Sequence, residues 1–211
     1  MQIAVIGAGN VGGTLGRRWA ALGHEVAFGV RRPKDGAAAV KGGGALPPRA
    51  RVARVADAAY EADVVVLATP WSAVRDALDE VGELDGVPLV DTTNPIGAGF
   101  ALDMGPRGES AAERIQAMAP RARVVKAFNT TGANNMANPM YGGAPAAMFV
   151  AGDDAVAKAV ATELATALGF ETFDAGPLAK ARELEHLASL WIHLAYAGGL
   201  GREIAFRVVR R

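Results

Sequence analysis

The sequence contains no cysteine among its 211 residues, and this absence removes several classes of chemistry. Disulfides, thiolate catalysis, haem–thiolate ligation and iron–sulfur clusters all require that side chain. Net charge is also missing, because 22 basic residues balance 22 acidic ones, so no overall field draws the chain to nucleic acid or to an anionic membrane. Apolar runs are broken by Gly, Asp or Pro well short of a bilayer span. These absences lead us to expect a soluble cytoplasmic protein that binds neither nucleic acid nor membranes.

Strand and helix patterns alternate along the chain, which is typical of a parallel sheet covered by helices on both faces. The clearest strand covers residues 63–68, and a helix capped by Asp154 is expected at 155–168. Further strands are expected at 1–6, 25–28, 51–53, 88–90, 124–128, 148–151 and 171–173. We therefore expect an α/β fold with a Rossmann-type, doubly wound and mostly parallel sheet. Residues 1–177 would form this NADP-binding domain, and residues 178–211 would add a small helical C-terminal extension to the same compact unit.

A glycine-rich loop follows the first strand and opens the next helix. Its spacing is G-x-G-x-x-G, with Gly7, Gly9 and Gly12 at the three positions. In dinucleotide-binding folds the first glycine permits a tight turn, the second lets the backbone approach a pyrophosphate, and the third lets helix and strand pack closely. The helix beginning near Asn10 adds free N–H groups and the positive end of its dipole. We therefore expect a dinucleotide here; the alternative is a Rossmann-like fold that has lost its nucleotide.

Two arginines, Arg31 and Arg32, directly follow the second strand, where NAD-binding folds usually place an acidic residue. A carboxylate would take the 2′-hydroxyl of NAD, whereas the planar guanidinium fork binds phosphate oxygens bidentately. We therefore predict that the cofactor is NADP(H), held at its 2′-phosphate by these arginines. The alternative is that both arginines belong to a solvated turn.

The expected carboxyl ends of the other strands carry mainly small or amide-bearing residues, and in open parallel sheets these ends face the ligand. They show no histidine, no lysine and no serine beside a base, one of which a hydrolase or a metal enzyme would need. Small neutral side chains suit a flat redox cofactor, for which positioning contributes more than proton transfer. The alternative for the threonines and asparagines is helix capping. We assign no catalytic residue and no metal ligand, and expect further cofactor contacts from Thr69, Pro70, Asn94, Pro95 and Asn129.

An apolar stripe marks the last predicted helix. Leu184, Leu187, Trp191 and Leu194 recur at three- and four-residue steps along it. Packing against the chain's own sheet is one explanation of this stripe. Because Tyr196 and its neighbours add apolar surface on another side of the helix, we expect this helix to meet its two-fold mate in a homodimer.

Several segments taken together resemble the coenzyme F-420-dependent NADP oxidoreductases, a family that uses a deazaflavin hydride carrier. They are residues 1–29 with the two arginines that follow, 124–130, 150–154, 174–178 and 181–185. They are also similar to the oxidoreductase domain of the STEAP metalloreductases, which passes NADPH electrons to a flavin. Residues 130–145 are nearer to the flavin-type relatives than to the deazaflavin reductases.

This resemblance implies a Rossmann-type domain with a small C-terminal part, usually dimeric. It also implies direct hydride transfer between NADP(H) and coenzyme F-420 or a flavin, FMN or FAD. By position, Gly9, Asn10 and Val11 would hold the pyrophosphate and Arg31 the 2′-phosphate. Two other functions stay open, namely NADPH-dependent reduction of a small carbonyl or imine, and NADP(H) sensing by a regulator without turnover.

Overall fold

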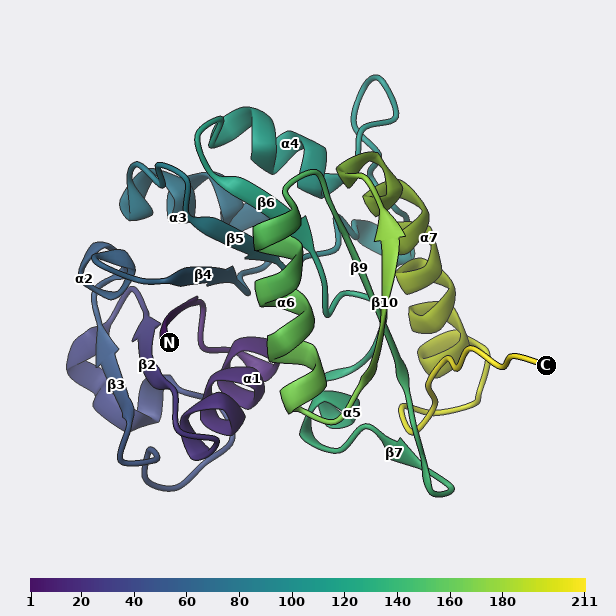
Figure 1. Cartoon of the computed structure of the whole chain (residues 1–211), viewed down its shortest axis with the longest axis horizontal. Coiled ribbons are helices and arrows are strands. Elements are labelled where there is room, and N and C mark those ends of the chain that lie inside the picture. Colours follow the sequence, from purple (N-terminus) through teal and green to yellow (C-terminus); the bar gives the residue numbers. More distant parts are fainter.

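A main sheet of eight strands runs through the molecule in the order β10-β9-β6-β5-β4-β1-β2-β3 (Figure 1). This computed structural model describes the backbone of residues 1–211 and every side chain except that of Ala98. The strands are β1 (Gln2–Ile6), β2 (Glu25–Gly29), β3 (Ala50–Ala53), β4 (Val64–Leu67), β5 (Pro88–Asp91), β6 (Arg123–Lys126), β9 (Ala147–Gly152) and β10 (Glu171–Gly176). Every neighbouring pair is parallel except β6 with β9, so the predicted doubly wound and mostly parallel fold is confirmed.

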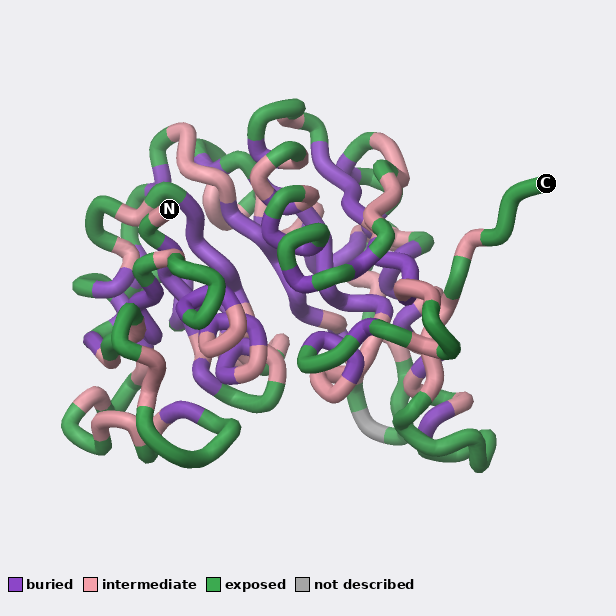
Figure 2. The backbone as a smooth tube through the Cα atoms, turned by 60° about the horizontal axis from the view of Figure 1, so that its bottom comes forward, coloured by how far each residue is buried: buried purple, intermediate pink, exposed green. Residues whose placement is uncertain are grey.

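Helices cover both faces of this sheet, and each face has its own apolar core. Side chains alternate along the strands, so that Ile3 and Val5 of β1 belong to one core, and Ala4 and Ile6 to the other. Figure 2 shows the strands buried in the interior and the outward sides of the helices exposed. None of the described helices has the length and apolar character needed to cross a membrane. The first core takes in α1 (Asn10–Ala21) and α6 (Ala155–Ala167), and the second takes in α2 (Val55–Ala59), α3 (Val74–Val81) and α4 (Ala111–Met118).

The predicted helical extension is helical only as far as Ala197. Helix α7 (Ala181–Ile192) continues into the wider turn η5 (His193–Ala197), and the described residues 198–211 form neither helix nor strand. Gly199 has a φ of 76°, a left-handed conformation that glycine adopts without strain and that ends the helix. The last segment then returns to the sheet, where the Ala147 N–H donates to the Phe206 carbonyl at 2.9 Å.

The segment between β6 and β9 also contains structure that the sequence did not predict. A short helix and a small hairpin fill it, namely α5 (Ala133–Ala137), β7 (Met140–Tyr141) and β8 (Ala144–Pro145). Asn134 and Asn135 of α5 donate to the carbonyls of Arg202 and Ile204, at 2.8 and 2.6 Å. This segment therefore holds the C-terminal residues against the sheet.

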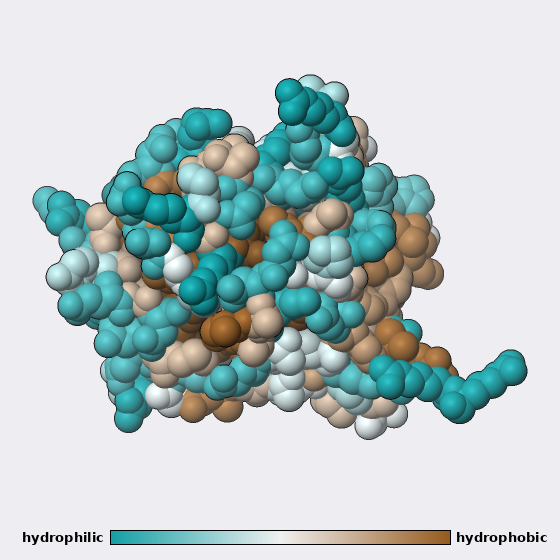
Figure 3. Space-filling view, turned by 45° about the horizontal axis from the view of Figure 1, so that its top comes forward, coloured by the Kyte–Doolittle hydropathy of each residue, from teal (hydrophilic) through white to brown (hydrophobic). Residues whose placement is uncertain are grey.

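Part of the apolar stripe on α7, for which the sequence predicts a dimer contact, is buried inside the chain itself. Leu184 and Trp191 are only 5% and 4% exposed because they pack against their own chain, and the Trp191 indole donates to the Ile204 carbonyl at 2.9 Å. The exposed apolar side chains on this part of the chain are Leu190, Tyr196 and Leu200. Figure 3 shows apolar surface along the side of the molecule that α7 forms.

Candidate functional site

The loop between β1 and α1 has a conformation that requires glycine at two positions, Gly7 and Gly12. Gly7 has a φ of 95° and donates its N–H to the Gly29 carbonyl at 3.0 Å, which ties the loop to the end of β2. A Cβ on Gly12 would lie 1.9 Å from the Gly7 carbonyl oxygen. Because no side chain can occupy that space, α1 packs against the end of β1 only with glycine at position 12.

The start of α1 is open to a ligand. Gly9 is its N-cap, no side chain of the described residues caps it, and its first turn holds no acidic residue. A Cβ on Gly9 would meet nothing within 4 Å, so there is free space in front of this residue. The N–H groups of the first turn therefore remain available to an anion, and the positive end of the helix dipole favours one.

Basic residues follow β2, the strand that pairs with β1 beside this loop. Arg31 and Arg32 follow β2 directly and are exposed, with Arg32 3.9 Å from Asp35. Sequence reasoning missed Lys41, whose N–H donates to the Ala8 carbonyl at 2.9 Å and so places its backbone against the glycine loop. Arg17 of α1 holds this segment by donating to the Lys41 carbonyl at 3.1 Å. Lys41 and Ala8 are 33 residues apart, and such a separation gives no sequence signal for the contact.

Two predicted asparagines meet at the ends of β5 and β6. The Asn129 amide donates to Asn94 Oδ1 at 3.0 Å, and the Asn94 amide donates to the Asn129 carbonyl at 2.9 Å. Asn129 also donates to the Leu184 carbonyl of α7 at 3.1 Å, while its own Oδ1 is buried with no partner among the described residues. An orphaned buried oxygen is rare in proteins and indicates a place for a ligand or a water. The structure therefore joins Asn94 and Asn129 in one unit.

The remaining predicted contacts lie at the neighbouring strand ends. Thr69 follows β4, and its buried hydroxyl also has no partner in the described chain. Pro70 is exposed at the start of the helical turn η2 (Trp71–Ala73), and Pro95 is buried beside Asn94. The Thr92 hydroxyl donates to the Leu67 carbonyl at 3.1 Å, so this threonine has a structural role.

One prediction about these strand ends is wrong. Strand β6, expected to reach Phe128, ends at Lys126, and β5 ends at Asp91, so a lysine and a carboxylate stand side by side at the carboxyl edge. Both are fully buried, and Lys126 Nζ lies 2.6 Å from Asp91 Oδ2 and 2.8 Å from Oε1 of Glu185, on α7. Their burial behind Thr93 excludes direct contact with a bound substrate in this arrangement. A lysine and an aspartate at consecutive strand ends were the signal that could have indicated the pair.

A second ion pair joins α4 to α7 near the surface. Arg182 donates to both carboxylate oxygens of Glu113, at 2.8 and 2.6 Å, and Ser110 forms a capping box with the same glutamate. The hydrogen bonds from Arg182 are the main reason that the pKa of Glu113 falls from 4.5 to about 2. Burial opposes this shift, and the hydrogen bonds from Ser110 add to it.

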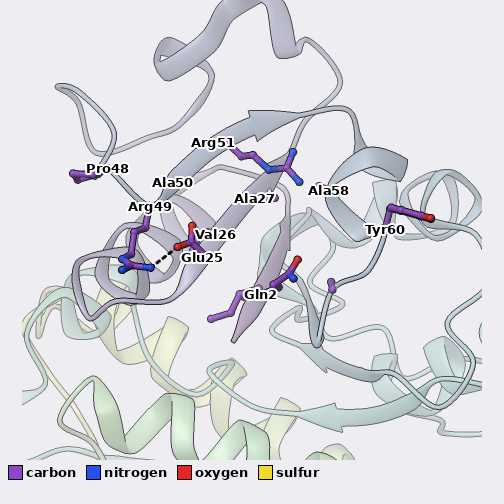
Figure 4. Close-up of a pocket in the computed structure, with 12 residues that line it drawn as sticks. Gln2, Glu25, Val26, Ala27, Pro48, Arg49, Ala50, Arg51, Ala58 and Tyr60 are labelled. Carbon is purple, nitrogen blue, oxygen red and sulfur yellow. Dashed lines mark hydrogen bonds and ion pairs between the residues drawn. The ribbon is translucent and has the colours of Figure 1, made fainter.

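The pocket drawn in Figure 4 lies at the opposite end of the sheet from these residues. It is lined by Gln2, Glu25 and Ala50, the first residues of β1, β2 and β3, and its volume is about 160 Å³. Arg49 and Glu25 form an ion pair across it. Ligands of open parallel sheets bind at the carboxyl ends of the strands, so this small pocket is not the candidate site.

The chain is similar to known proteins along its whole length. The family model for coenzyme F420-dependent NADP oxidoreductases matches residues 2–95, which include the glycine loop, the arginine pair and Asn94. A solved structure from Arthrobacter sp. FB24, of a protein assigned as an F420-dependent NADP reductase, is 36% identical, covers all of both chains and has a TM-score of 0.87. The chain belongs to this family.

Two further relatives cover most of the chain. The solved structure of the hypothetical protein SMa0349 from Sinorhizobium meliloti is 30% identical, covers 86% of this chain and 88% of its own, and has a TM-score of 0.76. Metalloreductase STEAP3 of Rattus norvegicus is 30% identical over 185 residues, which are 87% of this chain. The chain spans 36% of that curated relative.

The residues present fit the cofactor that the F420-dependent NADP oxidoreductase family implies. The open space at Gly9 and the uncapped start of α1 suit a pyrophosphate, and the exposed Arg31 beside them suits a 2′-phosphate. The Thr69 hydroxyl and Asn129 Oδ1, which have no hydrogen-bond partner in the described chain, would supply polar partners to the end of the cofactor away from its phosphates. The arrangement can therefore hold a long, anionic dinucleotide across the carboxyl edge of the sheet.

Proposed function

We propose that this protein is an NADPH-dependent oxidoreductase that passes a hydride between NADP(H) and coenzyme F-420 or a flavin. The observation that carries the proposal is the uncapped start of α1 at Gly9 with Arg31 and Arg32 beside it. The full-length similarity to a protein assigned as an F420-dependent NADP reductase supports coenzyme F-420 as the hydride acceptor.

Each part of the nucleotide would have its own residues. Backbone N–H groups at Gly9, Asn10 and Val11 would bind the pyrophosphate, and Arg31, with help from Arg32, the 2′-phosphate. Gly7 and Gly12 would keep the loop in the shape that this contact needs. At the nicotinamide end, Thr69, Pro70, Asn94, Pro95 and Asn129 would contact the ring and its amide.

The chemistry that these residues support is positioning. When bound, NADPH supplies the hydride from its nicotinamide ring. Asn94 and Asn129 are neutral and fix each other by two hydrogen bonds, so they can orient a ring without moving a proton. Holding two reactants in a productive geometry can account for about 7–11 kcal/mol of a barrier.

Stereospecifically deuterated NADPH tests the reaction and the acceptor in one experiment. The protein would be mixed anaerobically with labelled NADPH and, separately, coenzyme F-420, FMN or FAD, and the product analysed by mass spectrometry. A deazaflavin takes the hydride on carbon and keeps the label, whereas a reduced flavin carries it on nitrogen and exchanges it with water. Retained deuterium therefore supports coenzyme F-420, and NADPH oxidation with loss of the label supports a flavin.

One outcome contradicts the enzyme proposal. If NADPH binds tightly and none of the three acceptors oxidises it, the protein is not a reductase of these compounds, and a small carbonyl or imine should be offered next. If these acceptors fail as well, NADP(H) sensing without turnover is the function that remains.

A further inference from the structure

A fully buried cluster of charged side chains lies directly behind the strand ends of the candidate site. Lys126 Nζ lies 2.6 Å from Asp91 Oδ2 and 2.8 Å from Glu185 Oε1, and it donates to the Thr93 carbonyl at 2.7 Å. The Thr93 carbonyl is the hydrogen-bond acceptor of this ammonium group, and the two carboxylates are its ion-pair partners. Asp91, Lys126 and Glu185 are each 0% exposed. One hydrogen bond and two ion pairs therefore hold the Lys126 ammonium in its place.

The cluster also reaches a helix terminus. Glu185 Oε2 accepts from the Ala111 N–H at 3.0 Å, and its Oε1 lies 3.4 Å from the Ala112 nitrogen, so this carboxylate satisfies the first N–H groups of α4. Burial raises the pKa of Glu185, and the neighbouring Lys126 only partly opposes that shift. A buried ionic cluster is a poor device for stability alone, because apolar residues of similar volume often stabilise a fold better.

The backbone held by this cluster leads to the two asparagines. Asp91 Oδ1 accepts from the Thr93 N–H at 2.8 Å and Lys126 donates to the Thr93 carbonyl, so the cluster fixes both main-chain groups of the residue before Asn94. Asn129 follows Lys126 by three residues and donates to the Leu184 carbonyl, next to Glu185. Both asparagines are therefore attached to the cluster, one through each strand end.

We propose that Lys126 is a positioning residue, which locks the Thr93–Asn94 turn and helix α7 in one relation to each other and thereby sets the orientation of Asn94 and Asn129. Its effect on turnover rests on the proposed function, whereas its effect on the turn and on α7 does not. A displacement of these asparagines would leave the phosphate subsites near Gly9 and Arg31 unchanged, because the cluster has no partner in common with them in the described structure.

Lys126→Met tests this proposal, because methionine keeps an unbranched side chain as far as Cε and removes the ammonium. Lys158→Met is the matched control. Lys158 of α6 pairs with Asp174 of the edge strand β10 at 2.8 Å, and it contacts no cluster residue among those described. In the ligand-free protein, we expect backbone amide exchange at Thr93, Asn94, Ala111 and Ala112 to accelerate by at least about tenfold in Lys126→Met and to stay unchanged in Lys158→Met.

Affinity and turnover separate positioning from a merely structural role. We expect the Kd for 2′-phospho-ADP-ribose, which fills the phosphate subsites but lacks the nicotinamide ring, to change by no more than about twofold, as for sites without shared partners. The turnover number per folded molecule should fall roughly 100-fold, the cost of a displacement of about 1 Å. A fall in folded fraction with an unchanged turnover number would overturn the proposal, and so would unchanged exchange at Thr93 and Asn94.

Glu185→Gln keeps the proposal testable if Lys126→Met does not fold. The Asp91–Lys126–Thr93 contacts remain in this variant, so exchange should accelerate at Ala111 and Ala112 and not at Thr93. Equal acceleration at all of these amides would mean that the cluster acts as one structural unit, which contradicts the proposed lock. If the unmodified protein transfers no hydride to any acceptor, the proposed function fails, and the exchange data still decide whether Lys126 holds the turn.

Discussion

The two ends of the candidate site reach fixed geometry by opposite means. At the nucleotide end, Gly7, Gly9 and Gly12 shape the loop by the absence of side chains, and the backbone itself faces the ligand. At the proposed nicotinamide end, where the hydride acceptor must also bind and which is called the acceptor end below, the buried Lys126 and Asp91 hold the main chain. The amides of Asn94 and Asn129 hold each other there. A site made of main-chain groups depends only on the local sequence. A site made of side chains depends on the whole fold, which brings those side chains together from distant parts of the sequence.

The difference has a physical reason in what each end has to bind. A pyrophosphate is an anion of constant shape, so free N–H groups and a helix dipole recognise it without any specific side chain. A neutral ring offers little charge, so its orientation depends on amide and hydroxyl groups that must be rigid before it arrives. Burying three charged groups is costly, and the precision of the neighbouring turn is what this arrangement provides.

The largest expected effect on stability comes from a substitution at Gly12, where the fold leaves no room for a side chain. Gly12→Ala would place a Cβ 1.9 Å from the Gly7 carbonyl oxygen, and we expect it to lower the free energy of unfolding by about 3 kcal/mol or more. Thermal unfolding followed by circular dichroism measures this loss. An unchanged melting temperature would show that α1 can move away from β1 without penalty.

Gly9→Ala is the matched control for that substitution. Gly9 has a φ of −71° and open space around it, so alanine should fold at a cost below about 1 kcal/mol. The added methyl would occupy the space in front of the loop, and we expect NADPH to bind at least about tenfold more weakly. Normal affinity in Gly9→Ala would place the pyrophosphate elsewhere.

Arg31→Ala removes charge from the nucleotide end and leaves its backbone intact. A hydrogen bond to a charged group contributes about 1.5–3 kcal/mol, so NADPH should bind roughly 10- to 150-fold more weakly while NADH affinity hardly changes. Isothermal titration with both cofactors measures the difference. Arg49→Ala, in the pocket at the other end of the sheet, serves as the control and should alter neither affinity. Equal losses for both cofactors would assign Arg31 a structural role.

The nucleotide end could be proposed from the sequence because its evidence is contiguous. The strand, the glycine spacing and the arginine pair all lie within residues 1–32, and each fits a local rule of backbone geometry or charge. The sheet was recoverable for the same reason, since buried parallel strands are continuous apolar runs. Such patterns depend on neighbours in the chain and not on the tertiary arrangement.

The acceptor end could not be read in the same way. Asp91, Lys126 and Glu185 come from two strands and a helix that are distant in sequence, and only the order of the strands and the docking of α7 bring them together. The stripe on α7 showed that one side of the helix is apolar without showing what covers it. The final segment was also unpredictable, because Asn134, Asn135 and Trp191 hold its carbonyls by side-chain hydrogen bonds.

Two glutamate carboxylates at the start of α4, that of Glu113 from α4 itself and that of Glu185 from α7, should give the acceptor end opposite responses to pH. Glu113 has its pKa lowered from 4.5 to about 2, so its pairing stabilises the fold above pH 4.5 and is lost as the pH falls toward 2. Glu185 has its pKa raised by burial, so its contribution is present below its ordinary pKa and is lost as the pH rises through the raised value. The same helix therefore has an acid-sensitive and a base-sensitive partner.

Glu113→Gln should remove the acid-sensitive part alone. Because the Arg182 side chain is 43% exposed, we discount the shift for solvent screening and expect a loss of about 1–2 kcal/mol at neutral pH. The melting temperature measured between pH 2 and pH 7 should vary less in the variant than in the unmodified protein, and the two curves should approach each other in acid. Parallel curves over this range would contradict the assignment.

The smallest effect on folding is expected at the exposed apolar side chains beyond the acceptor end, where we propose that a second copy of the chain docks. Leu190, Tyr196 and Leu200 are 49%, 55% and 59% exposed, and Tyr196 stacks on Phe100 with ring centroids 5.9 Å apart. The chain has no net charge, so two copies do not repel each other. This surface replaces the buried stripe as the candidate contact, because Trp191→Glu would disrupt the monomer instead of the interface.

Leu190→Glu tests this contact without disturbing either end of the site. An exposed substitution should change the stability of the monomer by no more than about 0.5 kcal/mol, but a glutamate in the centre of an apolar interface would bury an unpaired charge and separate the copies. Sedimentation velocity at micromolar concentration should show a dimer for the unmodified protein and a monomer for the variant. Val156→Glu, on the exposed side of α6, is the matched control and should remain dimeric. A monomeric unmodified protein would refute the dimer, and a dimeric Leu190→Glu would place the interface on another face.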